Sequence, residues 1–171
     1  MLGRLICEAV NKKEKGEIVM ANFRLVKSQI KEVVEAVDVE DRLDESQTYY
    51  VDLTKKEFTK NNQCDGRLKV ERVLFLPANL PKYHIERNDG SMTLTMELKS
   101  FRNVLLLESG IFTTDDNLLD SNFSIKVNGQ VACSSQCVND ETEVTISQKE
   151  YETELLSICM VAFCVKHNLL K

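Results

Sequence analysis

Two histidines are the first residues to consider for acid–base chemistry, because unperturbed histidine titrates near physiological pH. His84 lies between Tyr83 and Ile85 in an alternating segment, so a strand there would point its ring away from those two side chains, toward solvent. His167 ends a long apolar segment, where a cation suits the dipole of a helix. Neither histidine belongs to a recognisable catalytic motif, and we therefore expect a protein that is not an enzyme.

Six cysteines offer disulfide or metal chemistry: Cys7, Cys64, Cys133, Cys137, Cys159 and Cys164. Cys133 and Cys137 are spaced like a pair of zinc ligands, but structural zinc sites usually combine two such pairs. The opening M-L-G-R-L-I-C-E contains no apolar stretch long enough for a signal peptide. We expect reduced cysteines that serve as small core residues, in the cytoplasm or nucleus, with zinc binding as the alternative.

No cofactor is expected, because the six glycines form no phosphate-binding loop and no nucleotide-binding motif. The segment 55–87 is locally basic, although the formal net charge of the chain is −5. A β-barrel-like subunit could bind nucleic acid through such residues. The side chains concerned are Lys55, Lys56, Lys60, Arg67, Lys69, Arg72, Lys82 and Arg87. The acidic overall balance makes this the alternative function.

The clearest structural element lies at the C-terminus, over 147–170. Ser147 and Glu150 have the spacing of a capping box, which predicts a helix start. Of the eleven residues from Leu155 to Val165 only Ser157 is polar, so this helix must be buried on nearly all sides. Eleven residues are too few to span a bilayer, which takes about 20. The segment is predicted to be the core helix of the domain, packed on one face of a sheet.

The N-terminal segment 1–45 is expected to be mainly helical, with a short amphipathic helix before Gly16. From 19 to 37, apolar residues recur at steps of four and three, which favours one long helix with a heptad-like seam. The seam residues are Val19, Phe23, Val26, Ile30, Val33 and Val37. The alternative is a strand over 19–25 followed by a shorter helix capped by Ser28, because alternation and β-branched residues also mark the front of this segment.

The segment 47–146 has the texture of an antiparallel β meander. Residues 91–98 alternate strictly between apolar and polar side chains, and Asn128–Gly129 is the preferred two-residue hairpin turn. The polar segment 55–66 is expected to be a loop that closes on an Asp-Gly turn. Together these segments predict one α+β domain over 1–171, with about six or seven antiparallel strands, one or two N-terminal helices and a buried C-terminal helix.

The amount of apolar surface favours a binding function. One face of a sheet can cover only one side of the C-terminal helix, and the seam from Val19 to Val37 adds a second apolar stripe. We therefore expect a non-catalytic protein–protein interaction or assembly module, either a dimer or a subunit of a larger intracellular complex. The seam would form its interface. If the two helices pack on each other instead, no apolar surplus remains and the chain would be a monomer.

Overall fold

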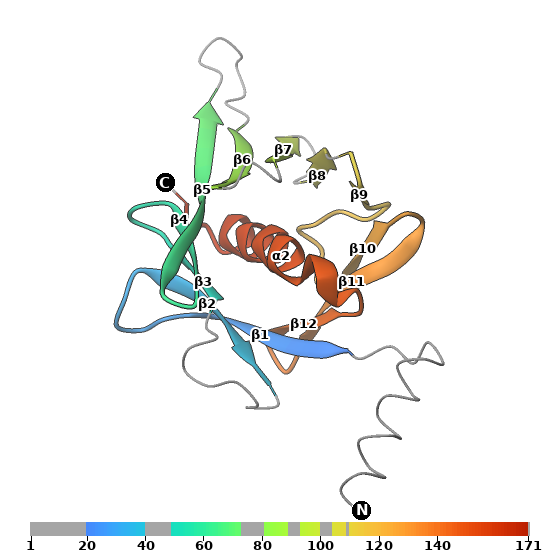
Figure 1. Ribbon diagram of the computed structural model, residues 1–171, viewed down its shortest axis with the longest axis horizontal. Helices are drawn as coiled ribbons and strands as arrows, with labels where there is room; N and C mark the ends of the chain where they lie inside the picture. Colours follow the sequence, from blue (N-terminus) through green and yellow to red (C-terminus); the bar gives the residue numbers. More distant parts are fainter. Residues whose placement is uncertain are drawn as a thin grey trace, which may run out of the picture.

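One antiparallel sheet of twelve strands and one C-terminal helix make up the computed structural model, which describes residues 20–39, 49–72, 81–88, 93–99, 104–108 and 110–170 (Figure 1). The strands are β1 Ala21–Lys27, β2 Val33–Asp38, β3 Tyr49–Asp52, β4 Glu57–Lys60, β5 Gln63–Arg72, β6 Pro81–Arg87, β7 Thr93–Lys99, β8 Val104–Glu108, β9 Phe112–Thr113, β10 Phe123–Val127, β11 Gln130–Val138 and β12 Glu141–Ile146. A 3-10 turn, η1 Lys149–Tyr151, leads into α2 Glu152–Lys166.

The sheet curls around α2 until its two edges meet. The strand order runs from β8 down to β1 and then from β12 down to β9, so β8 and β9 are the edges. The Leu118 N–H donates to the Leu105 carbonyl at 3.2 Å, and the Leu105 N–H donates to Asn117 Oδ1 at 2.9 Å. These bonds join β8 to the loop after β9, and the strands surround the helix in Figure 1.

Burial of α2 on nearly all sides follows from this enclosure and confirms the expectation of a buried C-terminal helix. Leu155, Leu156 and Ile158 are each 0 % exposed, although they point in different directions from the helix. Helix α2 packs against one face of the sheet, as expected, but this face curls around the helix and covers it from several sides (Figure 1). Inward side chains such as Val34 of β2 and Ile125 of β10 reach the same core from different sides, so the apolar circumference is covered within the chain.

The predicted helix over 19–37 is wrong, because residues 21–38 form the antiparallel hairpin of β1 and β2. Leu25 pairs with Ala36 and both are buried. Ser28 does not cap a helix; its Oγ accepts hydrogen bonds from the N–H groups of Ile30 and Lys31, at 3.2 and 3.1 Å, in the turn between the strands. The alternative prediction of a strand at the front of this segment is correct, because β1 lies there. The short helix expected before Gly16 lies outside the described residues.

The α+β class with a helical N-terminal segment and six or seven strands is therefore incorrect: the described chain is a larger antiparallel sheet with one C-terminal helix. Part of the difference comes from 55–66, which contains β4 and the start of β5 rather than a loop. Asn61 and Asn62 form the turn between these strands with φ of 53° and 63°, a left-handed conformation that asparagine tolerates. The Asn128–Gly129 turn is confirmed, with φ of 53° and 78°.

The helix also begins differently from the capping-box prediction. The Ser147 hydroxyl donates to the Val131 carbonyl at 2.8 Å, which fixes it to β11 instead of to the helix start. Glu150 lies in η1, and α2 begins at Glu152 without a side-chain cap. Glu152 and Glu154 place two carboxylates in its first turn, where they interact favourably with the helix dipole.

Candidate functional site

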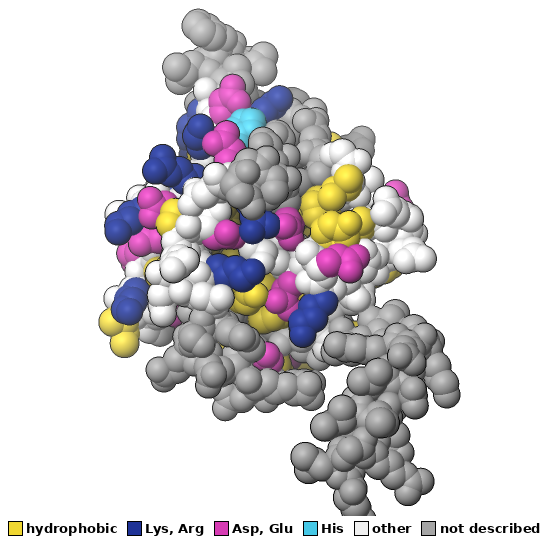
Figure 2. Space-filling view, in the orientation of Figure 1, with side chains coloured by type: hydrophobic (Ala, Val, Ile, Leu, Met, Phe, Trp, Pro, Cys, Tyr) yellow, Lys and Arg dark blue, Asp and Glu magenta, His cyan; other side chains and the backbone are white. Residues whose placement is uncertain are grey.

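The outer surface of the β1–β2 hairpin carries apolar side chains where a curled sheet would normally be polar. In β1 and β2, Leu25 and Ala36 face the core, whereas Val26 and Val37 face outward and are 38 % and 43 % exposed. Ile30, in the turn between the strands, is 94 % exposed. We call Val26, Ile30 and Val37 the hairpin face. Hydrophobic atoms protrude at the left margin of Figure 2, where Figure 1 places this turn.

Exposed apolar residues concentrate in this hairpin. Nine large hydrophobic residues among those described are exposed, and five of them lie within residues 20–39: Met20, Val26, Ile30, Val37 and Val39. Scattered single apolar residues on a surface need no explanation, but a cluster on one element is typical of a binding surface. The hairpin is therefore the best-supported candidate site.

A hollow of about 940 Å³ adjoins the hairpin face on the outer surface of β2 and β3. It is lined by Lys31, Glu32, Val33, Glu35, Tyr50, Asp52, Thr54 and Asn62. Glu32 lies 3.7 Å from Lys27 Nζ. Asp52 Oδ1 accepts hydrogen bonds from the N–H groups of Thr54 and Lys55, both at 2.9 Å, so it orders the next turn. The hollow combines an apolar floor at Val33 with three carboxylates.

The six residues predicted for a helical interface do not share one face. Phe23 is 2 % exposed and faces the core, whereas Val33 is 7 % exposed and contributes only to the floor of the hollow. Val26, Ile30 and Val37 are exposed and form the hairpin face. Val19 lies outside the described residues. The predicted interface thus loses its helical geometry; Val26 and Val37 face outward from the β1–β2 hairpin, and Ile30 protrudes from its turn.

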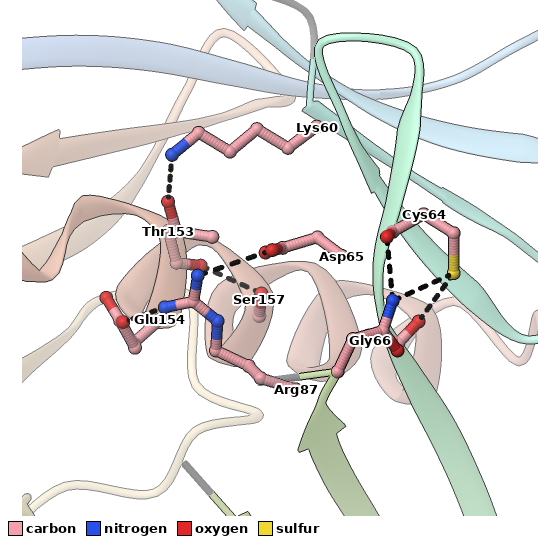
Figure 3. Close-up of polar contacts among 9 residues, drawn as sticks. Lys60, Cys64, Asp65, Gly66, Arg87, Thr153, Glu154 and Ser157 are labelled. Carbon is pink, nitrogen blue, oxygen red and sulfur yellow. Dashed lines mark hydrogen bonds and ion pairs between the residues drawn. The ribbon is translucent and has the colours of Figure 1, made fainter. Parts of the chain in front are cut away.

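A second polar group lies inside the sheet at the start of α2 (Figure 3). Arg87 of β6 pairs with Glu154 of α2 and, at 3.3 Å, with Asp65 of β5. Lys60 Nζ donates to Thr153 Oγ1 at 3.1 Å. These contacts tie three strands to the first turns of the helix. Because each charge already faces an opposite charge or a hydrogen-bond acceptor, we assign the group to anchoring α2 rather than to chemistry.

Tyr49 completes this anchor from β3. Its hydroxyl donates to Glu152 Oε2 at 2.8 Å, and the Lys60 ammonium lies 5.7 Å from its ring centroid. Burial, and then the hydrogen bond to the Glu152 carboxylate, raise the pKa of Tyr49 far above its usual value. The phenol therefore keeps its proton and acts as a hydrogen-bond donor, which suits a structural role.

The basic residues predicted for nucleic-acid binding are divided between the inside and the outside of the sheet. Lys60 and Arg87 belong to the anchor of α2. Outside, two of the basic residues have carboxylates as strand neighbours: Arg67 pairs in register with Glu57 and Glu86, and Lys82 pairs with Glu71. Lys69 Nζ also lies 3.1 Å from Glu86. Cationic and anionic side chains alternate over the left side of Figure 2, where Figure 1 places β4–β6.

Three of the outer cations nevertheless surround one hollow. Lys56, Lys69 and Arg72 line a depression of about 650 Å³ on β5 and β6, together with Glu71 and His84 among others. Lys55 lies in the turn between β3 and β4. This depression is the only feature of the predicted basic stretch, within the described chain, that gathers cations around a concave surface.

Both histidines contact neighbouring side chains of the fold. His84 Nε2 lies 2.9 Å from Glu71 Oε2, and the ring of His167 packs at 4.3 Å from that of Phe163. Desolvation, and then the charge of Lys166, lower the pKa of His167.

The cysteine pair that could have bound zinc is separated in the structure. Cys133 is buried with its Sγ 3.6 Å from Cys159 Sγ, so it does not pair with Cys137, which is exposed. Within the described ranges no three metal-binding side chains converge.

Comparisons with protein-family models, curated proteins and solved structures find no match for this chain. None of the helices in the described part of the chain has the length and apolarity needed to cross a membrane.

The sequence carried a signal for the hairpin face, but not for the hollow beside it. Val26, Ile30 and Val37 stood out by their periodicity, whereas Glu35 and Tyr50 lie on neighbouring strands and meet only through the register. A strand assignment for 21–38 would have placed Val26 opposite Glu35. The position of Tyr50 depends on the pairing of β2 with β3, for which the sequence has no short-range turn signal.

Proposed function

We propose that this chain is a non-catalytic protein–protein interaction module that binds a partner through the hairpin face, as a subunit of a larger intracellular complex or as a dimer. The observation that carries the proposal is the concentration of exposed apolar residues in the β1–β2 hairpin. Burying each exposed aliphatic side chain against a partner contributes about 1–3 kcal/mol. A hairpin face of three such residues supplies the apolar centre of an interface of ordinary affinity.

The surroundings of the candidate chemical groups support a non-catalytic role. His84 is held by Glu71, and the Tyr49 phenol by Glu152. The largely buried ion pair Arg87–Glu154 joins a strand to α2. The Tyr49 and Arg87 contacts stabilise the enclosed helix, whereas the His84–Glu71 contact joins β6 to β5 on the outer surface of the sheet.

Affinity purification of the full chain from its native cells tests the proposal. The test variant replaces Val26, Ile30 and Val37 with serine, and the control is Val131→Ser, which removes an apolar side chain that is 49 % exposed on β11. We expect at least one protein to be recovered in stoichiometric amount with the wild type and the control but not with the triple variant. Recovery of the same proteins with all three forms would refute the proposal.

Light scattering of the purified chain separates the two forms of assembly. A dimer at tens of micromolar that becomes a monomer in the triple variant identifies a second copy as the partner. A monomer for both forms, together with the recovery of a different protein above, identifies a hetero-complex.

Nucleic-acid binding is the second candidate function, favoured by the depression that Lys56, Lys69 and Arg72 surround. Phosphate contacts make such binding strongly salt-dependent. A labelled single-stranded oligonucleotide should bind at low salt, and Lys56→Glu with Arg72→Glu should weaken binding and reduce its dependence on salt. An oligonucleotide that does not bind at low salt removes this candidate.

A further inference from the structure

We propose that the hollow beside the hairpin face receives a lysine or arginine side chain from an extended, apolar segment of a partner protein. This inference rests on the proposed function, because it assigns a ligand chemistry to the same surface. The hollow and the hairpin face together carry the three features that such a segment needs: apolar contact area, a concave site and unneutralised negative charge.

The strand register places these features side by side. Val26 of β1 pairs with Glu35 of β2, and Glu35 pairs with Tyr50 of β3, so the three side chains form one outward row. In a neighbouring row, Val33 pairs with Asp52. Adjacent strands lie about 4.8 Å apart, so Val26 and Tyr50 are separated by about 10 Å. Three or four residues of an extended chain, at about 3.3 Å each, span this row.

The charges of the hollow favour a cation. Its lining contains three carboxylates, Glu32, Glu35 and Asp52, and one ammonium group, that of Lys31. Lys27 partly neutralises Glu32, and Asp52 is engaged by the following turn. Glu35 has no ion-pair partner among the described residues, and it lies next to Val26. A cation in the hollow would therefore pair with Glu35 while its neighbouring apolar residues cover Val26 and Val37.

The same charges disfavour the other occupants. Nucleic acid would bring phosphates toward the three carboxylates, at a cost in Coulomb energy. A second copy of the chain carries the same net charge of −5, so two copies repel each other, and its Lys69 is already paired with Glu86. An extended segment with one free lysine or arginine satisfies the hollow without breaking an existing ion pair.

Fluorescence anisotropy with three labelled peptides of roughly nine residues tests the inference. The first alternates valine with lysine, the second replaces each lysine with glutamate, and the third replaces each valine with serine. We expect the valine–lysine peptide to bind the full chain, with affinity at least about tenfold higher than for either of the others. Glu35→Lys should lower that affinity about tenfold.

The matched control is Asp115→Lys, which makes the same charge reversal at a side chain that is 90 % exposed in the loop after β9. It changes the net charge of the chain equally, so it should leave the affinity unchanged if the hollow is the site. Equal losses in the two variants would show non-specific attraction and overturn the inference. Equal binding of the valine–glutamate peptide would overturn it as well.

Two results separate this inference from the proposed function. If the triple serine variant loses its partner but Glu35→Lys keeps both its partner and the peptide affinity, the hairpin face binds protein and the cation site is wrong. If self-association appears and Glu35→Lys abolishes it, the occupant is a second copy, and the inference of a separate partner is wrong.

Discussion

Gly66 shows how one residue limits the packing of the sheet. A Cβ added there would lie 2.6 Å from the Glu86 carbonyl oxygen, and backbone atoms cannot move aside cheaply. We expect Gly66→Ala to lower the free energy of unfolding by about 1–3 kcal/mol in urea denaturation. Gly110→Ala is the control, because nothing lies within 4 Å of its added Cβ. Equal stability of the two variants would contradict the close approach of β5 to β6.

The cysteines should differ sharply in reactivity. Burial raises the pKa of Cys164 to about 12, and its neighbour Cys133 together with burial raises that of Cys159 well above the usual thiol value. The reactive thiolate is therefore scarce and shielded at both sites at pH 8. Peptide mapping after alkylation at pH 8 should show modification of Cys64 and Cys137, which are exposed, and protection of Cys133, Cys159 and Cys164 until urea is added.

The same pKa shifts fix the sign of the pH dependence. The folded-state pKa of Cys164 is raised, so its contribution to stability is fully present below the pKa of the unfolded thiol, near 9. That contribution is lost as the pH rises above 9 toward 12, because the unfolded chain releases the proton first. Cys164→Ala should flatten the decline in stability between pH 8 and 10 that urea denaturation shows for the wild type. An unchanged slope would contradict this account.

At the scale of elements, the Arg87–Glu154 pair joins β6 to α2. Arg87 and Glu154 are 18 % and 15 % exposed, and removing one partner leaves the other charge poorly solvated. We expect Arg87→Met or Glu154→Gln alone to cost about 2–4 kcal/mol, and the double variant to cost less than the sum. The solvent-exposed Lys126–Asp115 pair is the comparison, and Lys126→Met should cost less than about 1 kcal/mol. Additive costs for Arg87 and Glu154 would show that the pair does not couple the two elements.

The β1–β2 hairpin has an inner and an outer face, which a long helix would not provide in this pattern. Val34 is 0 % exposed, so Val34→Ala should cost about 2 kcal/mol for the two buried methyl groups. Ile30 is 94 % exposed, and Ile30→Ala should change stability by less than about 0.5 kcal/mol. Thermal and urea unfolding of the two variants check this; a large loss at Ile30 would support the helical seam instead.

The elements were predictable where one local pattern dominated. The apolar run from Leu155 to Val165 identified the core helix, and Asn128–Gly129 identified a hairpin turn, because both signals are local. The segment 19–37 was wrongly predicted to be a helix. Two strands with alternating apolar residues, joined by a turn, can place apolar residues three and four positions apart, as a helix does. The Asn61–Asn62 turn, with positive φ at both residues, was missed because it lies in a polar stretch that looks like a loop.

The candidate site was predictable only in part. Three of the six seam residues are exposed together, but Phe23 and Val33 are buried, and no periodicity in the sequence distinguishes these two sets. Which side of a strand faces the core depends on how the sheet curls around α2. The hollow depends further on the register of three strands, which is a property of the whole sheet.

At the scale of the whole molecule, the closed arrangement of strands places the exposed apolar surface on the outside of the sheet, and not on the C-terminal helix as the sequence suggested. Because the meeting edges β8 and β9 complete the cover of α2, the helix itself offers no face to a partner. The surplus lies instead on the outside, in the β1–β2 hairpin and beside an acidic hollow. In the proposed function, one face of β1 and β2 helps to enclose the helix and the opposite face binds the partner.

Site-specific photocrosslinking in native cells tests this assignment most directly. A benzophenone side chain at position 30 is compared with one at position 131; Ile30 and Val131 are both exposed apolar residues, at 94 % and 49 %, on different parts of the surface. We predict a discrete protein adduct from position 30 that position 131 does not give, and whose yield falls when Val26 and Val37 are replaced with serine. No adduct from position 30, or the same adduct from both positions, would contradict the proposal that the hairpin face is the docking surface.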